Sequence, residues 1–438
     1  MRKVFIVFVF ALMLPVSAAH AGEGDAILTI LLKKGIINEQ EYRAIKEELK
    51  AGEEEKKVQL NTEIAEAIEY NKPEEKEEGW TDRINLSGLL EGEYRWRKRS
   101  DISNRNSGSA SDLYLRRFEL GLEAQLTDWM KAGAVLNSEW IGDEVNSGDE
   151  KITVDEATIT LQKEDFPLYL VLGKRTQPFG VFENHLVTDP MTQDAYETKR
   201  VGVSLGVTGP LGLDVSATLY KGEEQMDHLV DSGLLEVART GAPMDDVTSY
   251  ILSASVSPLE DHLMFFLSYL SEPGRGKRNS TVNVGLSAAV PGLEGLRLEG
   301  EYMKALERET FEGLGETFKE GVFSVTAAYL FNHSEGHEDI GGATLFERVT
   351  HLFEEPMELA FRYERFDDDD LAEKTASWSA RNRYSLGVRY PIYKDEERGL
   401  TAFIATEYRY TDYRLHSSLT DMRADDNKEL YLKLGVGF

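Results

Sequence analysis

The last nine residues, Leu430–Phe438, alternate strictly between apolar side chains and side chains that are polar or small, and they end on an aromatic residue. The apolar members are Leu430, Leu432, Leu434, Val436 and Phe438. In a β-strand, alternate side chains point to opposite faces, so this segment has one unbroken apolar face. A chain that repeats such strands many times behind an export signal is expected to form a barrel in an outer membrane.

The amino terminus has the pattern of an export signal. Arg2 and Lys3 are basic, Val4–Val16 is a short apolar run, and Ala19-His20-Ala21 fits an A-x-A cleavage site. This pattern predicts a signal peptide over residues 1–21 that is removed from the mature chain. No other stretch approaches the ~20 consecutive apolar residues that a transmembrane helix needs.

Composition excludes several classes of function. The chain has no cysteine, so disulfides, thiolate metal sites and cysteine nucleophiles are excluded. The formal net charge is −29, and removal of residues 1–21, which carry Arg2 and Lys3, leaves −31. Such an acidic chain is not expected to bind nucleic acid, whose phosphates repel it.

Residues 22–80 form a highly charged unit with helical periodicity. Asn38-Glu39-Gln40-Glu41 reads as a capping box, with Asn38 as the cap and Glu41 three residues later. Tyr42, Ile45 and Leu49 follow at helical spacing, and the acidic stretch before residue 80 reads as a linker. We expect a periplasmic helical or coiled-coil leader that associates between protomers; a loose charged leader is the alternative.

From Arg83 onward the period changes from 3.6 to 2, and residues 81–438 read as one all-β domain. The alternation predicts an antiparallel transmembrane β-barrel of about 16 strands, with 14 and 18 as limits. The expected strands are Ile84–Trp96, Phe118–Leu126, Met130–Trp140, Ala157–Leu161, Leu168–Gly173, Val203–Val207, Leu213–Leu219, Tyr250–Val256, Leu263–Leu270, Val282–Ala288, Leu296–Tyr302, Val322–Leu330, Leu359–Tyr363, Tyr384–Tyr390, Leu400–Tyr410 and Leu430–Phe438.

The connections between these strands alternate between short and long, as in barrels with short periplasmic turns and long external loops. Asn332–Pro356 is long where a short turn is due, and a further hairpin at Thr344–Phe353 would raise the strand count to eighteen. The long connections are Ser100–Ser111, Ile141–Lys151, Thr176–Arg200, Gly222–Thr248, Leu306–Glu320, Asp367–Ala380 and Asp412–Asp426.

Four short motifs resemble the phosphate-selective porin O and P superfamily, and most closely its LbtU-like siderophore porin branch. They are Val154-Asp155-Glu156-Ala157, Leu172-Gly173-Lys174, Pro178-Phe179-Gly180 and Thr188-Asp189-Pro190-Met191-Thr192. The last one is similar to the D-P-L-T element of that branch, with Met191 at the Leu position. The resemblance implies a homotrimeric pore for passive diffusion. It also implies a loop folded into the lumen, for which Thr176–Arg200 is the best candidate.

Selectivity in a pore comes from charge on the lumen side and from the width of the constriction. Strand alternation places Arg95, Arg97, Arg117 and Lys131 on the lumen side, together with Glu119 and Glu123. The pairs Lys174-Arg175 and Lys199-Arg200 flank the expected lumen loop and form a candidate anion-favouring neck. The alternative is ordinary ion pairing within the lumen that tunes no selectivity.

The sequence therefore predicts an outer-membrane porin for small hydrophilic solutes, with anions or ferric siderophores as candidates. Expected partners are outer-membrane lipid and lipopolysaccharide, the barrel-assembly machinery and two further copies of the chain. We expect no catalytic residues, no metal site and no cofactor. The alternative is a barrel that acts as an enzyme, or as a structural sheath around a partner protein.

Overall fold

The computed structural model describes residues 33–34, 38–44, 47, 83–101, 108–143, 151–223, 225–235, 245–259, 262–310, 317–331, 355–395, 398–419 and 424–438. The chain divides into two units, Met1–Gly79 and Trp80–Phe438. The predicted signal peptide lies outside the described residues, as does most of the predicted leader.

The described part of the first unit contains the capping box that the sequence predicts. The Asn38 side-chain oxygen accepts hydrogen bonds from the backbone N–H groups of Gln40 and Glu41, at 3.0 and 2.9 Å. The Glu41 carboxylate in turn accepts a hydrogen bond from the backbone N–H of Asn38, at 2.9 Å. These reciprocal bonds satisfy donors that have no partner inside the helix that follows.

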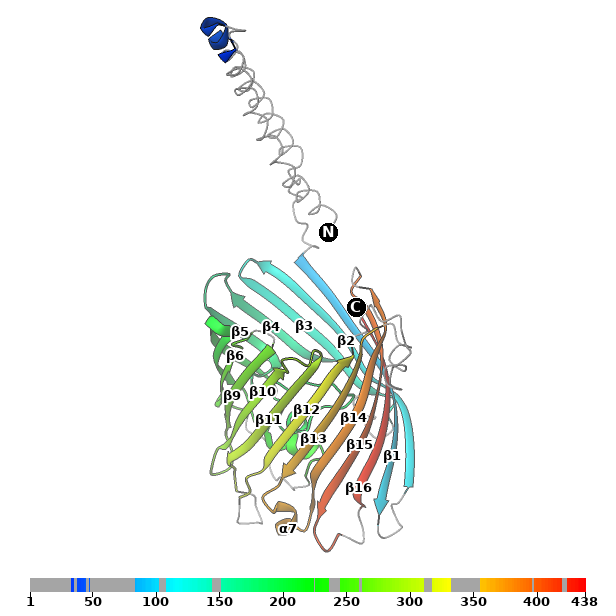
Figure 1. Ribbon diagram of the computed structural model, residues 1–438. Helices are drawn as coiled ribbons and strands as arrows, with labels where there is room; N and C mark the ends of the chain where they lie inside the picture. Colours follow the sequence, from blue (N-terminus) through cyan, green and yellow to red (C-terminus); the bar gives the residue numbers. More distant parts are fainter. Residues whose placement is uncertain are drawn as a thin grey trace, which may run out of the picture. The chain divides into compact units, whose positions relative to one another are not determined.

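The second unit is a closed barrel of sixteen antiparallel strands (Figure 1). The strands are β1 (Ile84–Asp101), β2 (Gly108–Thr127), β3 (Met130–Ile141), β4 (Thr153–Gln162), β5 (Leu168–Thr176), β6 (Lys199–Gly209), β7 (Leu213–Tyr220), β8 (Ser249–Val256), β9 (Leu263–Glu272), β10 (Asn279–Ala289), β11 (Leu296–Glu307), β12 (Gly321–Phe331), β13 (Met357–Asp367), β14 (Trp378–Asp395), β15 (Leu400–Leu415) and β16 (Ala424–Gly437). The predicted all-β fold and its central strand count are confirmed.

The carboxyl-terminal strand β16 closes the barrel by pairing with β1, from Leu89 opposite Gly437 to Asp101 opposite Ala424. Phe438 adds two backbone hydrogen bonds to Gly88, at 2.9 and 3.0 Å. Closure leaves no strand edge with unpaired N–H and C=O groups, which is a condition for a sheet that faces hydrocarbon.

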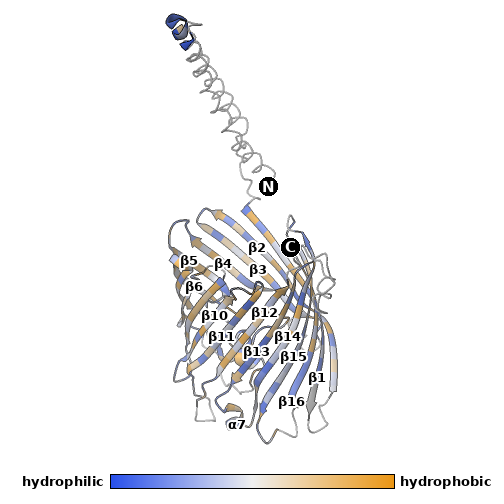
Figure 2. Ribbon diagram, viewed as in Figure 1, coloured by the Kyte–Doolittle hydropathy of each residue, from blue (hydrophilic) through white to orange (hydrophobic). Residues whose placement is uncertain are grey.

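The alternation along each strand separates an apolar outer face from a polar inner face, which Figure 2 shows as alternating colours along the strands. On β7, Leu213, Val215 and Leu219 are exposed on the outside, whereas Ser216 and Thr218 are buried inside. An outward apolar band around a closed barrel is the surface that a lipid bilayer requires.

The connections from even-numbered to odd-numbered strands lie at one end of the barrel and are short, except for that between β12 and β13. The short turns include Thr127–Met130 between β2 and β3, and the 3-10 turn η2 (Pro210–Gly212) between β6 and β7. β12 pairs directly with β13 from Gly321–Asp367 to Phe331–Met357, so the barrel closes with sixteen strands rather than eighteen. The hairpin expected at Thr344–Phe353 lies outside the described residues.

Several strands are longer than the apolar alternation predicts and continue into the segments expected to be loops, among them β1, β2, β14, β15 and β16. β2 has 20 residues and β14 has 18, whereas β7 and β8 have 8 each. Among the described residues, no helix is long and apolar enough to cross a membrane.

Within the described part of the long connections, three short helices contribute to an apolar core inside the barrel. They are α4 (Met191–Tyr196), α5 (Gln225–Asp231) and α7 (Leu371–Thr375). Fully buried side chains from these helices, such as Met191, Met226 and Leu371, join inward side chains of the wall, such as Ile251 and Val322, in one cluster. The inner faces of β6 and β7 carry small residues such as Gly202, Ser204 and Thr218.

Candidate functional site in the barrel lumen

The connection between β5 and β6, residues 177–198, folds into the barrel, and we name it the inward loop. The Gln177 side chain closes its base by donating hydrogen bonds to the carbonyls of Arg175 and Arg200, at 3.2 and 2.6 Å. Gly180 lies in the left-handed region (φ +94°), and a Cβ atom there would come within 2.4 Å of the Phe182 ring. A glycine is therefore required where the loop turns inward.

The middle of the inward loop binds the far wall of the barrel. The Thr188 backbone N–H and hydroxyl both donate to the Glu407 carboxylate on β15, at 2.8 Å each. Arg362 on β13 donates to the Thr188 and Asp189 carbonyls, at 2.8 and 3.1 Å. Lys433 on β16 donates to the Val187 carbonyl at 3.3 Å. The loop therefore crosses the interior, and the expectation of a lumen-folded segment at Thr176–Arg200 is confirmed.

Helix α4 fixes the return path of the inward loop. The Met191 backbone N–H donates to Glu364 on β13 at 2.5 Å, and Arg383 on β14 forms an ion pair with Asp194 at 2.8 Å. The Tyr196 hydroxyl donates to Glu320, which precedes β12, at 2.8 Å. These contacts join the loop to three neighbouring strands, so the narrowing of the lumen is a built feature of the fold.

His185 bridges two carboxylates from different strands. Its Nε2 lies 2.9 Å from Glu299 on β11, and its Nδ1 lies 3.1 Å from Glu358 on β13. Burial alone would lower the pKa of His185, but hydrogen bonds to the two carboxylates outweigh burial and raise it from 6.5 to about 9. The imidazole is therefore charged at neutral pH and donates from both nitrogens.

Six of the predicted pore-lining residues lie on the inner faces of β1, β2 and β3. Arg95 pairs with Asp143 at 3.3 Å and stacks on Tyr114, and Arg97 lies opposite the buried Glu429. Arg117 lies 3.6 Å from Glu139 and 3.9 Å from Glu119. Lys131 pairs with Glu123 at 2.9 Å near the short-turn end.

The predicted four-residue basic neck is wrong for two of its members. Arg175 and Arg200 are directly opposite each other, and Arg175 donates to the buried Ser204 hydroxyl at 2.9 Å, so both lie inside. Lys174 lies opposite the exposed Val201 and so is on the outer face, where it donates to the Val154 carbonyl at 2.6 Å. Lys199 shares the outward register of Val201 and pairs with Asp155 at 2.9 Å. Adjacent strand residues point to opposite faces, so neither dipeptide can place both cations in the lumen.

A β-bulge on β2 adds an arginine that the sequence prediction missed. Glu91 lies opposite Arg117 and Gly92 lies opposite Leu115, so Arg116 is the extra residue. Arg116 pairs with Glu139 at 3.1 Å and stacks on Trp140, 4.1 Å from the ring centre. The sequence shows this bulge as a shift in the apolar alternation. Leu113 and Leu115 are apolar at odd positions, whereas Phe118 and Leu120 are apolar at even positions.

A second set of missed charges lies on the wall of β13–β16, which the inward loop contacts. Arg409 pairs with Glu429 at 2.5 Å, and Lys433 lies 3.3 Å from Glu91. Arg362 and Glu364 form a fully buried pair at 3.3 Å. Each is a charged residue at an inward position of a strand with an apolar outer face, which is the pattern that could have identified them. The lumen thus carries paired charges of both signs rather than a basic ladder.

The described residues hold no group of three or more His, Asp or Glu side chains arranged to bind a metal ion. The histidines of the 332–356 segment lie outside the described residues. The four carboxylates Asp367–Asp370 are partly used by the fold, since Asp368 accepts hydrogen bonds from Ala372 and Ser379 and pairs with Arg414.

Solved outer-membrane channels share this fold. The chain is similar to the outer membrane channel DcaP of Acinetobacter baumannii, with a TM-score of 0.53 and 12% identity over 81% of this chain and 97% of that one. It is also similar to OmpF of Salmonella typhi, solved in complex with daunomycin, with a TM-score of 0.53 and 13% identity over 80% and 97% of the two chains. No family model matches the chain, and no curated protein matches it. At these identities the likeness establishes the fold, and the resemblance to the phosphate-selective superfamily and its siderophore branch stays a prediction.

Proposed function

We propose that this chain is an outer-membrane porin through which small hydrophilic solutes diffuse passively. The observation that carries the proposal is the inward loop, which is bonded to the inner faces of β13–β16 and narrows a closed barrel whose interior is charged. A lumen lined by charges and crossed by a loop filters solutes by size and charge. The fold shared with solved outer-membrane channels supports the same function.

The paired lumen charges favour weak charge selectivity over strong selectivity for phosphate. A pore strongly selective for anions would need clustered Arg and Lys with few competing carboxylates. In this lumen Arg95, Arg116 and Arg117 each have a carboxylate within 4 Å. Anions and ferric siderophores remain candidate solutes on the resemblance of the motifs alone.

The surroundings of the proposed porin follow from its architecture. The apolar outer face of the barrel would contact outer-membrane lipid. The long connections would contact the lipopolysaccharide of the outer leaflet of that membrane. We propose a signal peptide over residues 1–21, a periplasmic leader over 22–80 and a membrane barrel over 81–438. A homotrimer is supported by the resemblance and by the helical periodicity of the leader.

Planar-bilayer recording of the purified full-length protein tests this function. We expect steady ohmic channels, and reversal potentials in a salt gradient that show only a weak preference for either ion. Complete absence of conductance from folded protein would overturn the porin proposal. A strong preference for anions would be consistent with the porin proposal. It would contradict the proposal that paired charges of both signs determine the selectivity.

A further inference from the structure

Arg389 on β14 is a lumen arginine that differs from the paired cations around it. Ser385 and Gly387 are buried on the inner face of β14, and Arg389 continues this alternation toward the short turn that follows the strand. Its side chain is exposed, so its charge faces the open lumen. Within the part of the chain that the structure describes, its guanidinium contacts an aromatic ring and forms no ion pair, unlike that of Arg95.

The aromatic ring belongs to Phe403 on β15, and it holds the Arg389 guanidinium in one orientation. The guanidinium carbon lies 3.9 Å from the centre of the ring. Phe403 is buried, and its ring lies against Gly435 on β16, where an added Cβ atom would overlap with it. Stacking covers one face of the planar guanidinium, so the N–H donors at its edge stay available to a solute.

This stacked pair lies beside the inward loop. Phe403 packs in a buried apolar cluster with Val187 of the loop. The next loop residue toward the amino terminus, Leu186, lies over Gly387, where an added Cβ atom would come within 2.6 Å of it. Arg389 is the next inward position after Gly387 on β14. A solute that crosses the constriction therefore meets the guanidinium on the short-turn side of the loop.

The carboxylates closest to Arg389 in the sheet are already used by the inward loop. Glu358 on β13 lies directly opposite Arg389 in the strand pairing. Its carboxylate contacts Nδ1 of His185 at 3.1 Å, and Glu299 contacts Nε2 of the same ring at 2.9 Å. Both carboxylates thus face the charged imidazole, and the Arg389 donors are left to the lumen.

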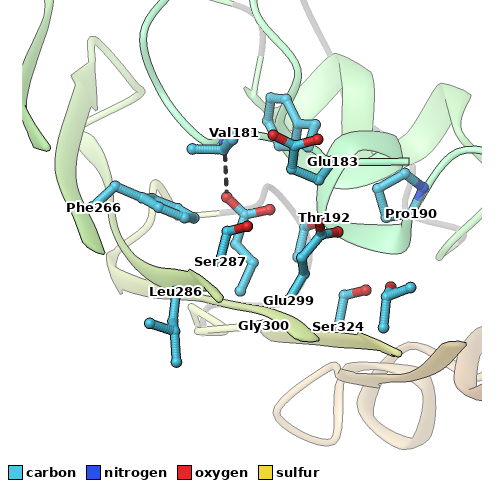
Figure 3. Close-up of a pocket in the computed structure, with 13 residues that line it drawn as sticks. Val181, Glu183, Pro190, Thr192, Phe266, Leu286, Ser287, Glu299, Gly300 and Ser324 are labelled. Carbon is cyan, nitrogen blue, oxygen red and sulfur yellow. Dashed lines mark hydrogen bonds between the residues drawn. The ribbon is translucent and has the colours of Figure 1, made fainter. Parts of the chain in front are cut away.

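The other carboxylates at the loop surround a separate space on the side of β9–β12. Figure 3 shows Glu183 and Glu299 at a cavity of about 30 Å³, which has room for a water molecule but not for a larger solute. The dashed line marks the hydrogen bond that the Val181 backbone N–H donates to Glu301, at 3.2 Å. Arg389 does not line this cavity, and none of these carboxylates pairs with it.

We propose that Arg389 is a specificity-determining residue of the pore, which binds the carboxylate group of small solutes as they cross the constriction. The inference rests on the proposed function, because the solute reaches Arg389 through the lumen. The edge donors of a guanidinium match the two oxygens of a carboxylate, and the same wall already pairs Arg409 with Glu429 in this way. One stacked arginine thus replaces the four-residue neck expected from the sequence.

Block of the bilayer current by a carboxylate tests this contact. The probe is potassium benzoate, added to channels of the full-length protein in potassium chloride, and benzyl alcohol is the matched compound that lacks the carboxylate. We expect benzoate to reduce the current saturably and benzyl alcohol to leave it unchanged. Arg389→Gln should raise the half-blocking concentration about tenfold or more, because charge-assisted hydrogen bonds are lost.

Two further variants separate this contact from charge alone and from the nearby turn. Arg389→Lys keeps the charge but cannot bind both oxygens with a planar fork, so its block should be intermediate between wild type and Arg389→Gln. Arg398→Gln is the matched control, since Arg398 lies in the turn after β14, is highly exposed and pairs with Asp395. Its block should equal that of the wild type. Heat-modifiable migration on a gel checks that each variant is folded.

The outcomes distinguish this contact from the porin function itself. A wild type that conducts but shows no saturable block by benzoate would overturn the role of Arg389 and leave the porin proposal intact. Equal block in Arg389→Gln, an equal loss in Arg398→Gln, or equal block by benzyl alcohol would do the same. A folded wild type that conducts no current would refute the porin function and this inference with it.

Discussion

Arg362 on β13 holds the inward loop at three of its residues. It donates to the Asn184 side chain at 3.2 Å and to the Thr188 and Asp189 carbonyls, and it pairs with Glu364. Arg362 and Glu364 are fully buried and the loop groups are partly buried. The loop and the ion pair therefore share one guanidinium, whose planar donors match several acceptors.

Arg362→Gln should therefore loosen the loop and destabilise the barrel. Removal of one partner from a buried ion pair costs about 3–5 kcal/mol, because the other charge is left unpaired. We expect a lower urea midpoint and noisier single-channel current. Lys131→Gln is the matched control, since its exposed pair contributes at most about 1 kcal/mol. Equal midpoints for the two variants would contradict the anchoring role of Arg362.

His185 should make the loop sensitive to alkaline pH. Its pKa is raised from 6.5 to about 9, so its stabilising contribution is fully present below pH 6.5 and is lost as pH rises through about 9. The shift corresponds to roughly 3 kcal/mol at most. We expect the urea midpoint of the wild type to fall between pH 7 and 10 more steeply than that of His185→Gln.

The comparison with His185→Gln isolates this group from the lysines and tyrosines that titrate in the same range. Parallel midpoint curves for the two proteins would refute the bridge between Glu299 and Glu358. A steeper fall at acidic pH would have the wrong sign for a group whose pKa is raised.

At the scale of single strands, the sequence correctly predicted which segments form the barrel strands. It did not predict the face of a side chain where the strand departs from simple alternation. The period of 2 identified every barrel strand, because an apolar outer face is required at each one. The predicted basic neck placed both Lys174 and Arg175 in the lumen, although adjacent residues of a strand point to opposite faces. Missing Arg116 came from a bulge, which shifts the phase by one residue and turns two neighbouring arginines inward.

Phe438, which directly follows β16, extends the pairing of that strand with β1. The Phe438 ring lies over Gly88, where an added Cβ would come within 2.5 Å of it, and the two backbones exchange hydrogen bonds. Phe438→Asp would place a charge on the outer face at the closing seam, where lipid contact disfavours it.

We therefore expect Phe438→Asp to lower the amount of folded barrel in the outer membrane severalfold while export continues. The measurement is an immunoblot of membrane fractions, with and without heating. Val247→Asp is the control, because Val247 is an exposed apolar residue in the long β7–β8 connection. Equal levels of both variants would contradict a role for Phe438 in assembly.

At the scale of the whole molecule, the interior of the barrel has an apolar part and a charged part. Apolar side chains of α4, α5 and α7 fill one part, while charged side chains of β1–β3 and β13–β16 line another. This division was not predictable from strand periodicity, because it depends on contacts between residues more than one hundred positions apart, such as Thr188 with Glu407. Local alternation fixes which face a residue takes, but not which charges meet across the lumen.

The central claim, that the inner face of the barrel is a water-filled pathway and the outer face is not, can be tested with two adjacent residues. Arg117 faces the lumen and is partly exposed, whereas Phe118 faces outward and is exposed. The chain has no cysteine, so single cysteines can be introduced without background labelling. The measurement is bilayer current before and after addition of a charged thiosulfonate reagent to Arg117→Cys and Phe118→Cys. We predict a reduced current for Arg117→Cys alone, whereas equal reduction in both variants, or in neither, would contradict the account.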